Sequence, residues 1–116
     1  MKTDNQKIKE LIRLSDENPD LPIIPMVATE IVAEDSFAYW MGSIGESRKD
    51  IILNRNEYIT IGHDDIFDFL YEELENNTYD KELTEDEIKE LTDARIEELK
   101  SWKDIYEAII VYIELP

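Results

Sequence analysis

The chain has 116 residues, of which 42% are hydrophobic and 35% charged, and its 29 acids against 12 bases leave a net charge of −17. This length predicts a single domain, residues 1–116, with one hydrophobic core. The negative charge disfavours direct binding to nucleic acid or to an anionic membrane and attracts cationic partners. The chain has no cysteine, which excludes disulfides and thiolate metal sites.

The beginning of the chain is polar and charged. Its first 22 residues lack the apolar stretch of a signal peptide, and no later apolar run approaches the ~20 residues that a membrane-spanning helix needs. We therefore expect a cytoplasmic protein that does not associate with membranes.

Residues 4–17 are predicted to form the first helix. Apolar residues recur there at helical spacing from Ile8 to Leu14, after Thr3, which can cap the helix. Pro19 and Pro22 end this pattern, because a proline biases the residue before it away from helical geometry.

Four segments rich in β-branched and aromatic residues follow. Segments 23–32 and 37–45 are separated by turn-like residues and predict a hairpin. Segments 50–53 and 57–61 flank Asn54-Arg55-Asn56, whose asparagines tolerate positive φ, and predict a second hairpin.

The second half of the chain predicts two helices and a closing strand. A helix after Gly62 carries its apolar residues at Ile66, Phe67, Leu70 and Leu74. Thr84 and Glu87 form a capping box that opens another helix, ending near Lys103. The apolar face of that helix is predicted to comprise Ile88, Leu91, Leu99 and Trp102.

Residues 108–115 are apolar on both strand faces, which predicts a strand inside the sheet. Together, these elements predict an α+β fold. We expect an antiparallel or mixed sheet of about five strands with about three helices, mostly packed on one face.

The sequence offers few groups for catalysis. Asp64, Asp65 and Asp68 match the DDxxD pattern of magnesium-dependent prenyl-transfer enzymes, but 116 residues cannot enclose the deep apolar cavity of those enzymes. His63 is the only histidine, whereas catalytic zinc usually needs three protein ligands. No nucleophile lies beside a base in a recognisable pattern, and no glycine-rich phosphate loop is present. We therefore predict no enzyme activity, no cofactor and no bound metal.

The acids concentrate in residues 64–107, which hold 17 acids against 5 bases. At 100° per residue, each later helix carries a row of carboxylates opposite its apolar residues, with neighbours ~5 to 6 Å apart. The row on the helix after Gly62 comprises Asp65, Asp68, Glu72 and Glu75, and the row on the helix that Thr84 opens comprises Asp86, Glu90, Asp93 and Glu97.

Each row spans ~16 Å. If the helices lie side by side, eight carboxylates cover a length over which duplex DNA carries about nine charges. The rows therefore predict a surface that imitates DNA, although a solvated acidic face is the simpler alternative. Phe69 falls on the polar side of its helix and could anchor a partner, while Arg95 falls within the apolar stripe.

Three blocks of sequence resemble a family of small acidic proteins encoded by phages and prophages of Gram-positive bacteria. They are Glu17-Asn18-Pro19-Asp20-Leu21-Pro22-Ile23-Ile24-Pro25-Met26-Val27, Ala38-Tyr39-Trp40-Met41-Gly42-Ser43-Ile44-Gly45 and Ala108-Ile109-Ile110-Val111-Tyr112-Ile113-Glu114-Leu115-Pro116. The family has no catalytic motif to transfer. The resemblance implies a host bacterial cytoplasm, where small acidic phage proteins block host defence, as certain anti-CRISPR and anti-restriction proteins do by imitating DNA. In the second block, Tyr39 and Trp40 are expected on opposite faces of a strand.

Two functional hypotheses follow. The first is a phage accessory protein whose acidic rows, with Phe69, inhibit a basic, nucleic-acid-binding host protein such as a CRISPR effector. The second is a non-enzymatic oligomeric scaffold or adaptor that pairs through its sheet edge.

Overall fold

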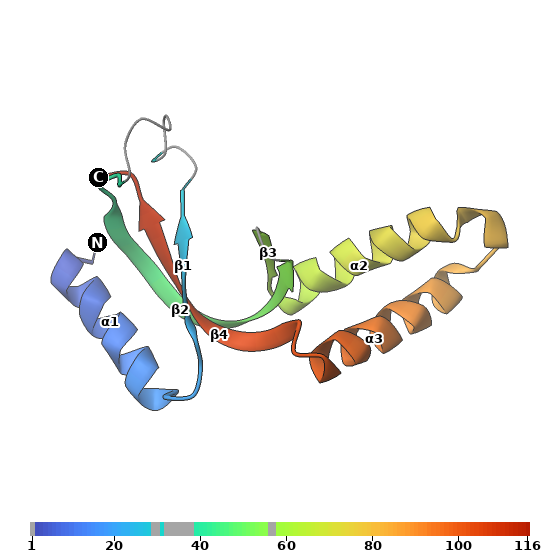
Figure 1. The fold of residues 1–116 in the computed structure, drawn as a ribbon, viewed down its shortest axis with the longest axis horizontal. Helices are drawn as coiled ribbons and strands as arrows, with labels where there is room; N and C mark the ends of the chain where they lie inside the picture. Colours follow the sequence, from blue (N-terminus) through green and yellow to red (C-terminus); the bar gives the residue numbers. More distant parts are fainter. Residues whose placement is uncertain (1, 29–30, 32–38, 56–57) are drawn as a thin grey trace. The chain divides into compact units, whose positions relative to one another are not determined.

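The computed structural model describes residues 2–28, 31, 39–55 and 58–116. Along the chain the elements are α1 (Asp4–Glu17), β1 (Ile23–Val27), β2 (Ser43–Arg55), β3 (Tyr58–Ile61), α2 (His63–Asn77), the 3₁₀ turn η2 (Tyr79–Lys81), α3 (Glu85–Ser101) and β4 (Ile105–Glu114) (Figure 1). The strands form one mixed sheet in the order β1-β4-β2-β3. The predicted α+β class is confirmed, with three helices and a four-stranded sheet.

Local hydrogen bonds fix where two of the helices begin. The hydroxyl of Thr3 accepts a bond from the backbone N–H of Gln6 (3.2 Å), and the Gln6 side-chain oxygen accepts one from the N–H of Thr3 (2.8 Å). Thr84 and Glu87 make the same reciprocal pair at the start of α3. Both capping predictions are thus confirmed, and each cap satisfies backbone donors that the first helical turn leaves unpaired.

The first predicted hairpin is wrong. β1 pairs in parallel with β4, in a register that sets Ile23 opposite Ile109. Residues 39–42 lie outside any strand and residues 43–45 begin β2, while residues 29–30 and 32–38 lie outside the described part of the chain. Alternation of apolar residues identifies segments that favour strands, but it does not determine which strand a segment pairs with.

The second hairpin and the interior position of the closing strand are confirmed, but β2 is one strand from Ser43 to Arg55 and so includes Asn54 and Arg55 of the predicted turn. β2 and β3 form the second hairpin, with Ile52 opposite Ile61 and Arg55 opposite Tyr58. β4 lies between β1 and β2, which confirms that the closing strand is interior. Its apolar residues therefore cover both faces of the sheet, as expected for a strand without a free edge.

The chain divides into two compact units. The terminal unit comprises residues 1–50 and 107–116, and it contains α1 and β1. The hairpin unit comprises residues 51–106, and it contains β3, α2 and α3. Within the terminal unit, the β4 residues Ala108, Ile109, Ile110 and Val111 are buried.

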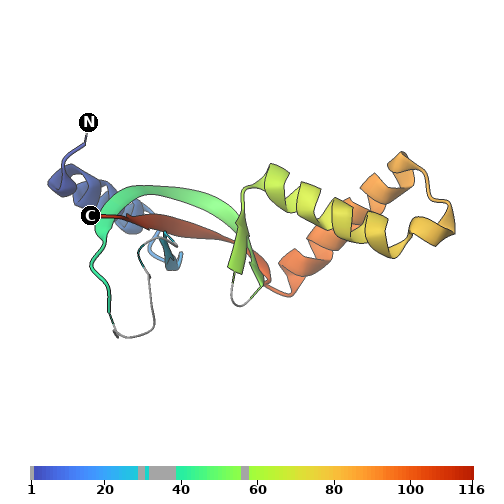
Figure 2. The same cartoon turned by 90° about the horizontal axis from the view of Figure 1, so that it is seen from above.

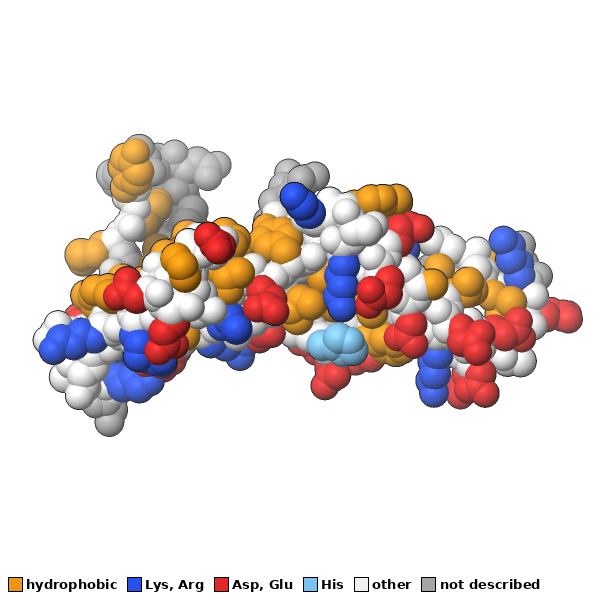
Figure 3. Space-filling view, turned by 90° about the horizontal axis from the view of Figure 1, so that it is seen from below, with side chains coloured by type: hydrophobic (Ala, Val, Ile, Leu, Met, Phe, Trp, Pro, Cys, Tyr) orange, Lys and Arg blue, Asp and Glu red, His pale blue; other side chains and the backbone are white. Residues whose placement is uncertain are grey.

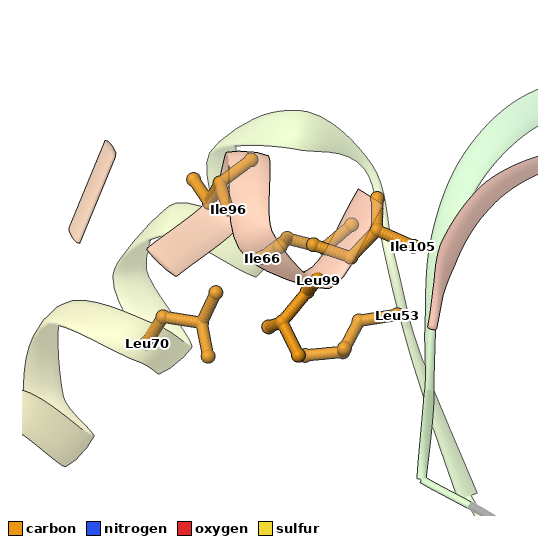
Figure 4. Packing of buried hydrophobic residues seen from close by; sticks show 6 residues of the cluster. All are labelled: Leu53, Ile66, Leu70, Ile96, Leu99 and Ile105. Carbon is orange, nitrogen blue, oxygen red and sulfur yellow. The ribbon is translucent and has the colours of Figure 1, made fainter. Parts of the chain in front are cut away.

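A six-residue cluster forms the core of the hairpin unit (Figure 4). β2 and β4 contribute one residue each, and each helix contributes two: Leu53, Ile66, Leu70, Ile96, Leu99 and Ile105. Burying an apolar side chain of this size stabilises a fold by ~1.5–3 kcal/mol. This cluster therefore holds both helices onto the strands of their unit.

The inner face of α3 differs from the prediction. Its buried residues are Ile88, Thr92, Ile96 and Leu99. Thr92 is fully buried because its hydroxyl donates to the carbonyl of Ile88 (2.7 Å) and so leaves no unpaired polar group. Leu91 and Trp102 are exposed instead, and their predicted burial is wrong.

Candidate partner-binding surface

The helices α2 and α3 pack against each other, and α2 also contacts β3. Figures 1 and 2 both show the two helices side by side, joined by the turn that contains η2. Residues 63–101 form this helical hairpin and hold 15 acids against 4 bases. A short, strongly acidic helical hairpin is therefore the most highly charged feature of its unit.

All eight carboxylates of the α2 and α3 rows are exposed. Figure 3 shows acidic side chains gathered over the part of the surface that α2 and α3 form, at the right of the view. The alternating steps of three and four residues place each row along one side of its helix. The structure thus places the predicted site residues in two exposed rows, with Phe69 as the exception described below.

Each acidic row lies on a helix that also contributes two residues to the core cluster. α2 turns Ile66 and Leu70 toward the core cluster, and α3 turns Ile96 and Leu99 toward it (Figure 4). At 100° per residue, the mean direction of each acidic row lies more than a quarter turn away from the mean direction of these buried residues. The hairpin therefore presents two rows of four exposed carboxylates, and a joint surface of all eight stays a prediction.

Basic side chains leave most of this charge uncompensated. Among the described residues, Glu97 is the one row carboxylate in an ion pair, with its Oε1 3.4 Å from the Nζ of Lys100. Glu73 and Glu98, which lie outside the rows, pair with Arg55 and Arg95. Neighbouring carboxylates at i, i+3 and i, i+4 repel each other, so the rows reduce the stability of their helices by a few tenths of a kcal/mol per pair.

The pKa of the Tyr71 phenol depends on the negative charge of the helical hairpin. Its ring stacks on that of Phe67, with the centroids 6.1 Å apart. Burial raises the pKa of the Tyr71 phenol above its ordinary value of 10.0, and the carboxylates of Glu75 and Glu85 raise it further. A raised phenol pKa means that the folded chain resists deprotonation, so folding stability decreases as the pH rises through 10.0 toward the folded-state pKa.

We predict that removing either neighbouring charge lowers the pKa of Tyr71. An NMR titration of the tyrosine ring signals should show Tyr71 deprotonating at lower pH in the variants Glu75→Gln and Glu85→Gln. Glu114→Gln, a charge change in the terminal unit, serves as the control and should leave this titration unchanged. An unaltered pKa in both hairpin variants would contradict the proximity of these carboxylates.

Phe69 does not project from the polar side of α2. It is half-buried and packs against the core cluster, so the covered side of α2 is wider than the apolar stripe alone. The guanidinium of Arg55 lies 5.8 Å from the ring centroid, and Arg55 also pairs with Glu73 (3.2 Å). The expected exposed position is therefore wrong, and a role of Phe69 in partner binding stays a prediction.

The exposure of the stripe of Leu91 and Trp102, on another side of α3, was not predicted from the sequence. Leu91 is 45% exposed and Trp102, the C-terminal cap of the helix, is 59% exposed. Arg95 lies between them, with its guanidinium 5.5 Å from the Trp102 ring centroid and an ion pair to Glu98. Tryptophan and arginine are enriched at the energetic centres of protein interfaces, so this stripe is a second candidate surface.

The aromatic pair Tyr39 and Trp40 lies outside any strand, so its expected alternation across a strand is wrong. Tyr39 is 92% exposed, and Trp40 is exposed to a smaller degree. Both residues belong to the terminal unit.

The described residues contain no group of three or more histidine, aspartate or glutamate side chains placed to hold a metal ion. Asp64, Asp65 and Asp68 lie exposed on the first turns of α2, where carboxylates interact favourably with the helix dipole. The absence of a bound metal stays a prediction. No helix in the described part of the chain combines the length and the apolar character needed to cross a membrane.

Comparison with protein-family models, curated proteins and solved structures found no match to this chain. The sequence resemblance to small acidic phage proteins therefore stays a prediction.

Proposed function

We propose that this chain is a non-enzymatic binding protein that inhibits a basic, nucleic-acid-binding host protein by occupying its nucleic-acid site with the acidic helical hairpin. In the phage setting that the sequence resemblance suggests, a CRISPR effector is an example of such a nucleic-acid-binding host protein. The observation that supports the proposal is the pair of exposed, largely uncompensated carboxylate rows on α2 and α3.

The spacing of each row is compatible with this role. A row places four carboxylates over ~16 Å of helix. One strand of duplex DNA carries a charge every ~3.4 Å along the axis, or about five charges over the same length. A single row therefore resembles one phosphate strand in charge density, and a groove lined with lysine and arginine for such a strand could accept it.

The direct test is competition with DNA. The tagged chain, incubated with lysate of a Gram-positive host at low salt, should retain basic nucleic-acid-binding proteins. Increasing concentrations of duplex DNA should then displace the chain progressively from each purified target. Binding should fall steeply as salt increases, because the Debye length shrinks from ~10 Å at 0.1 M to ~3 Å at 1 M.

Two results would contradict the proposal. One is a purified target that binds DNA and this chain at the same time without loss of affinity for either. The other is binding that persists at 1 M salt, because an apolar interface would then carry the affinity and the exposed stripe of Leu91 and Trp102 would become the first surface to examine.

A further inference from the structure

β1 forms one edge of the sheet, and two hydrogen bonds fix which of its residues face outward. The N–H of Ile109 donates to the carbonyl of Pro22 (2.9 Å), and the N–H of Ala28 donates to the carbonyl of Ile113 (2.9 Å). In a parallel ladder, the backbone groups of alternate residues point to the same neighbouring strand. Residues 22, 24, 26 and 28 therefore bond to β4, and residues 23, 25 and 27 direct their N–H and C=O groups away from it.

Pro25 is the central residue of this outward set. Proline has no N–H, so within the described part of the chain the outer edge of β1 offers the donors of Ile23 and Val27 but none between them. The side chains of Ile23 and Val27 are 46% and 51% exposed and carry no charge. An uncharged, exposed edge of this kind is otherwise a template for pairing with another chain, and proline is one of the residues that prevent such pairing.

We propose that Pro25 keeps the β1 edge from pairing with the same edge of a second copy of this chain. A two-fold antiparallel pair centred on this residue would set Pro25 opposite Pro25, with two carbonyls facing each other and no donor between them. The pairs on either side, Ile23 opposite Val27 of the second copy, would be interrupted at the centre. Pro25 therefore disfavours the form of the scaffold hypothesis in which the β1 edge pairs with itself, and it does not affect the β3 edge.

The test is the oligomeric state of Pro25→Val, measured by sedimentation equilibrium at 0.1 M and 1 M salt. High salt matters because the net charge of −17 also opposes association and is screened there. At 1 M salt, the dimer dissociation constant of the variant should be about 10- to 100-fold lower than that of the native chain. The reason is that each copy regains one backbone N–H, which allows two more hydrogen bonds per dimer. Pro116→Val makes the same chemical change outside any strand and should leave the dissociation constant unchanged.

Amide hydrogen exchange shows whether the association uses this edge. In the native chain the N–H groups of Ile23 and Val27 should exchange quickly, while those of Ile24 and Met26 are protected by β4. In associated Pro25→Val, the amides of Ile23 and Val27 should become protected. Adding Val27→Lys places a charge at the edge and should restore the monomer.

Three outcomes would overturn the proposal. The first is a Pro25→Val chain, folded by circular dichroism, that associates no more than the native chain at 1 M salt. The second is association without protection of the Ile23 and Val27 amides. The third is a native chain that already dimerises with those amides protected. Should the valine variant fold poorly, Pro25→Thr restores the same donor and decides the question.

Discussion

Replacing the four carboxylates of the α3 row by their amides is expected to weaken binding to a basic partner by roughly 10- to 1000-fold, mainly through a slower association rate. The substitutions are Asp86→Asn, Glu90→Gln, Asp93→Asn and Glu97→Gln. They retain side-chain shape while removing the charge that would attract a groove lined with lysine and arginine. Surface plasmon resonance with a purified target at several salt concentrations would give both the association rate and its salt dependence.

A matched control separates the row from the net charge of the chain. Four exposed carboxylates of the terminal unit can be neutralised in the same way: Asp16, Glu17, Asp20 and Glu114. This control changes the total charge by the same amount and should reduce binding far less than the α3-row variant does. Equal losses would mean that overall charge, and not the row, attracts the partner.

The corresponding variant of the α2 row tests the geometry of the hairpin. Because each row lies on its own helix, a groove that accepts one phosphate strand should contact one row more closely, so the two variants should differ in effect. Both should remain folded, with melting temperatures equal to or slightly above that of the native chain, since repulsion between neighbouring carboxylates is relieved. Undiminished binding by both variants would refute the DNA-mimic hypothesis, and Leu91→Ala and Trp102→Ala would then be the variants to measure.

Ending the chain at Glu107 is expected to unfold the terminal unit. The truncation removes the buried residues 108–111 of β4 and separates β1 from β2, which β4 joins. Burial of three large apolar side chains contributes ~1.5–3 kcal/mol each, which is comparable with the ~5–15 kcal/mol net stability of a typical domain. NMR signals of residues 2–50 should collapse to random-coil positions.

The hairpin unit should respond less to the same truncation. Its six-residue core cluster lies entirely before residue 107, so much of the helical circular dichroism of α2 and α3 should persist. A chain ending at Glu114 is the control, because it loses only the exposed Leu115 and Pro116 and should remain folded. A truncated chain that stays folded and monomeric, while the full chain is oligomeric, would identify β4 as an assembly element and revive the scaffold hypothesis.

The sequence by itself determined the features that depend on near neighbours in the chain. The start of α1 at Asp4 and that of α3 at Glu85 follow from capping residues three positions apart, and their hydrogen bonds need no tertiary contact. The β2–β3 hairpin follows from the strand-forming segments before Asn54 and after Asn56, although Asn54 and Arg55 themselves pair with Ile59 and Tyr58. The acidic rows are also local, because carboxylates on the polar side of a helix remain exposed whatever packs on the other side.

Only the tertiary structure decided what depends on distant residues. Segment 23–27 has the same strand-forming composition whichever strand it pairs with, and its pairing with residues 109–113 joins parts of the chain that periodicity cannot relate. On the helices, packing against the core cluster half-buries Phe69, while α3 buries Thr92 and leaves Trp102 exposed. Burial at the margins of an amphipathic helix depends on the width of the surface that covers it, and that width is set by the neighbouring elements and not by the helix itself.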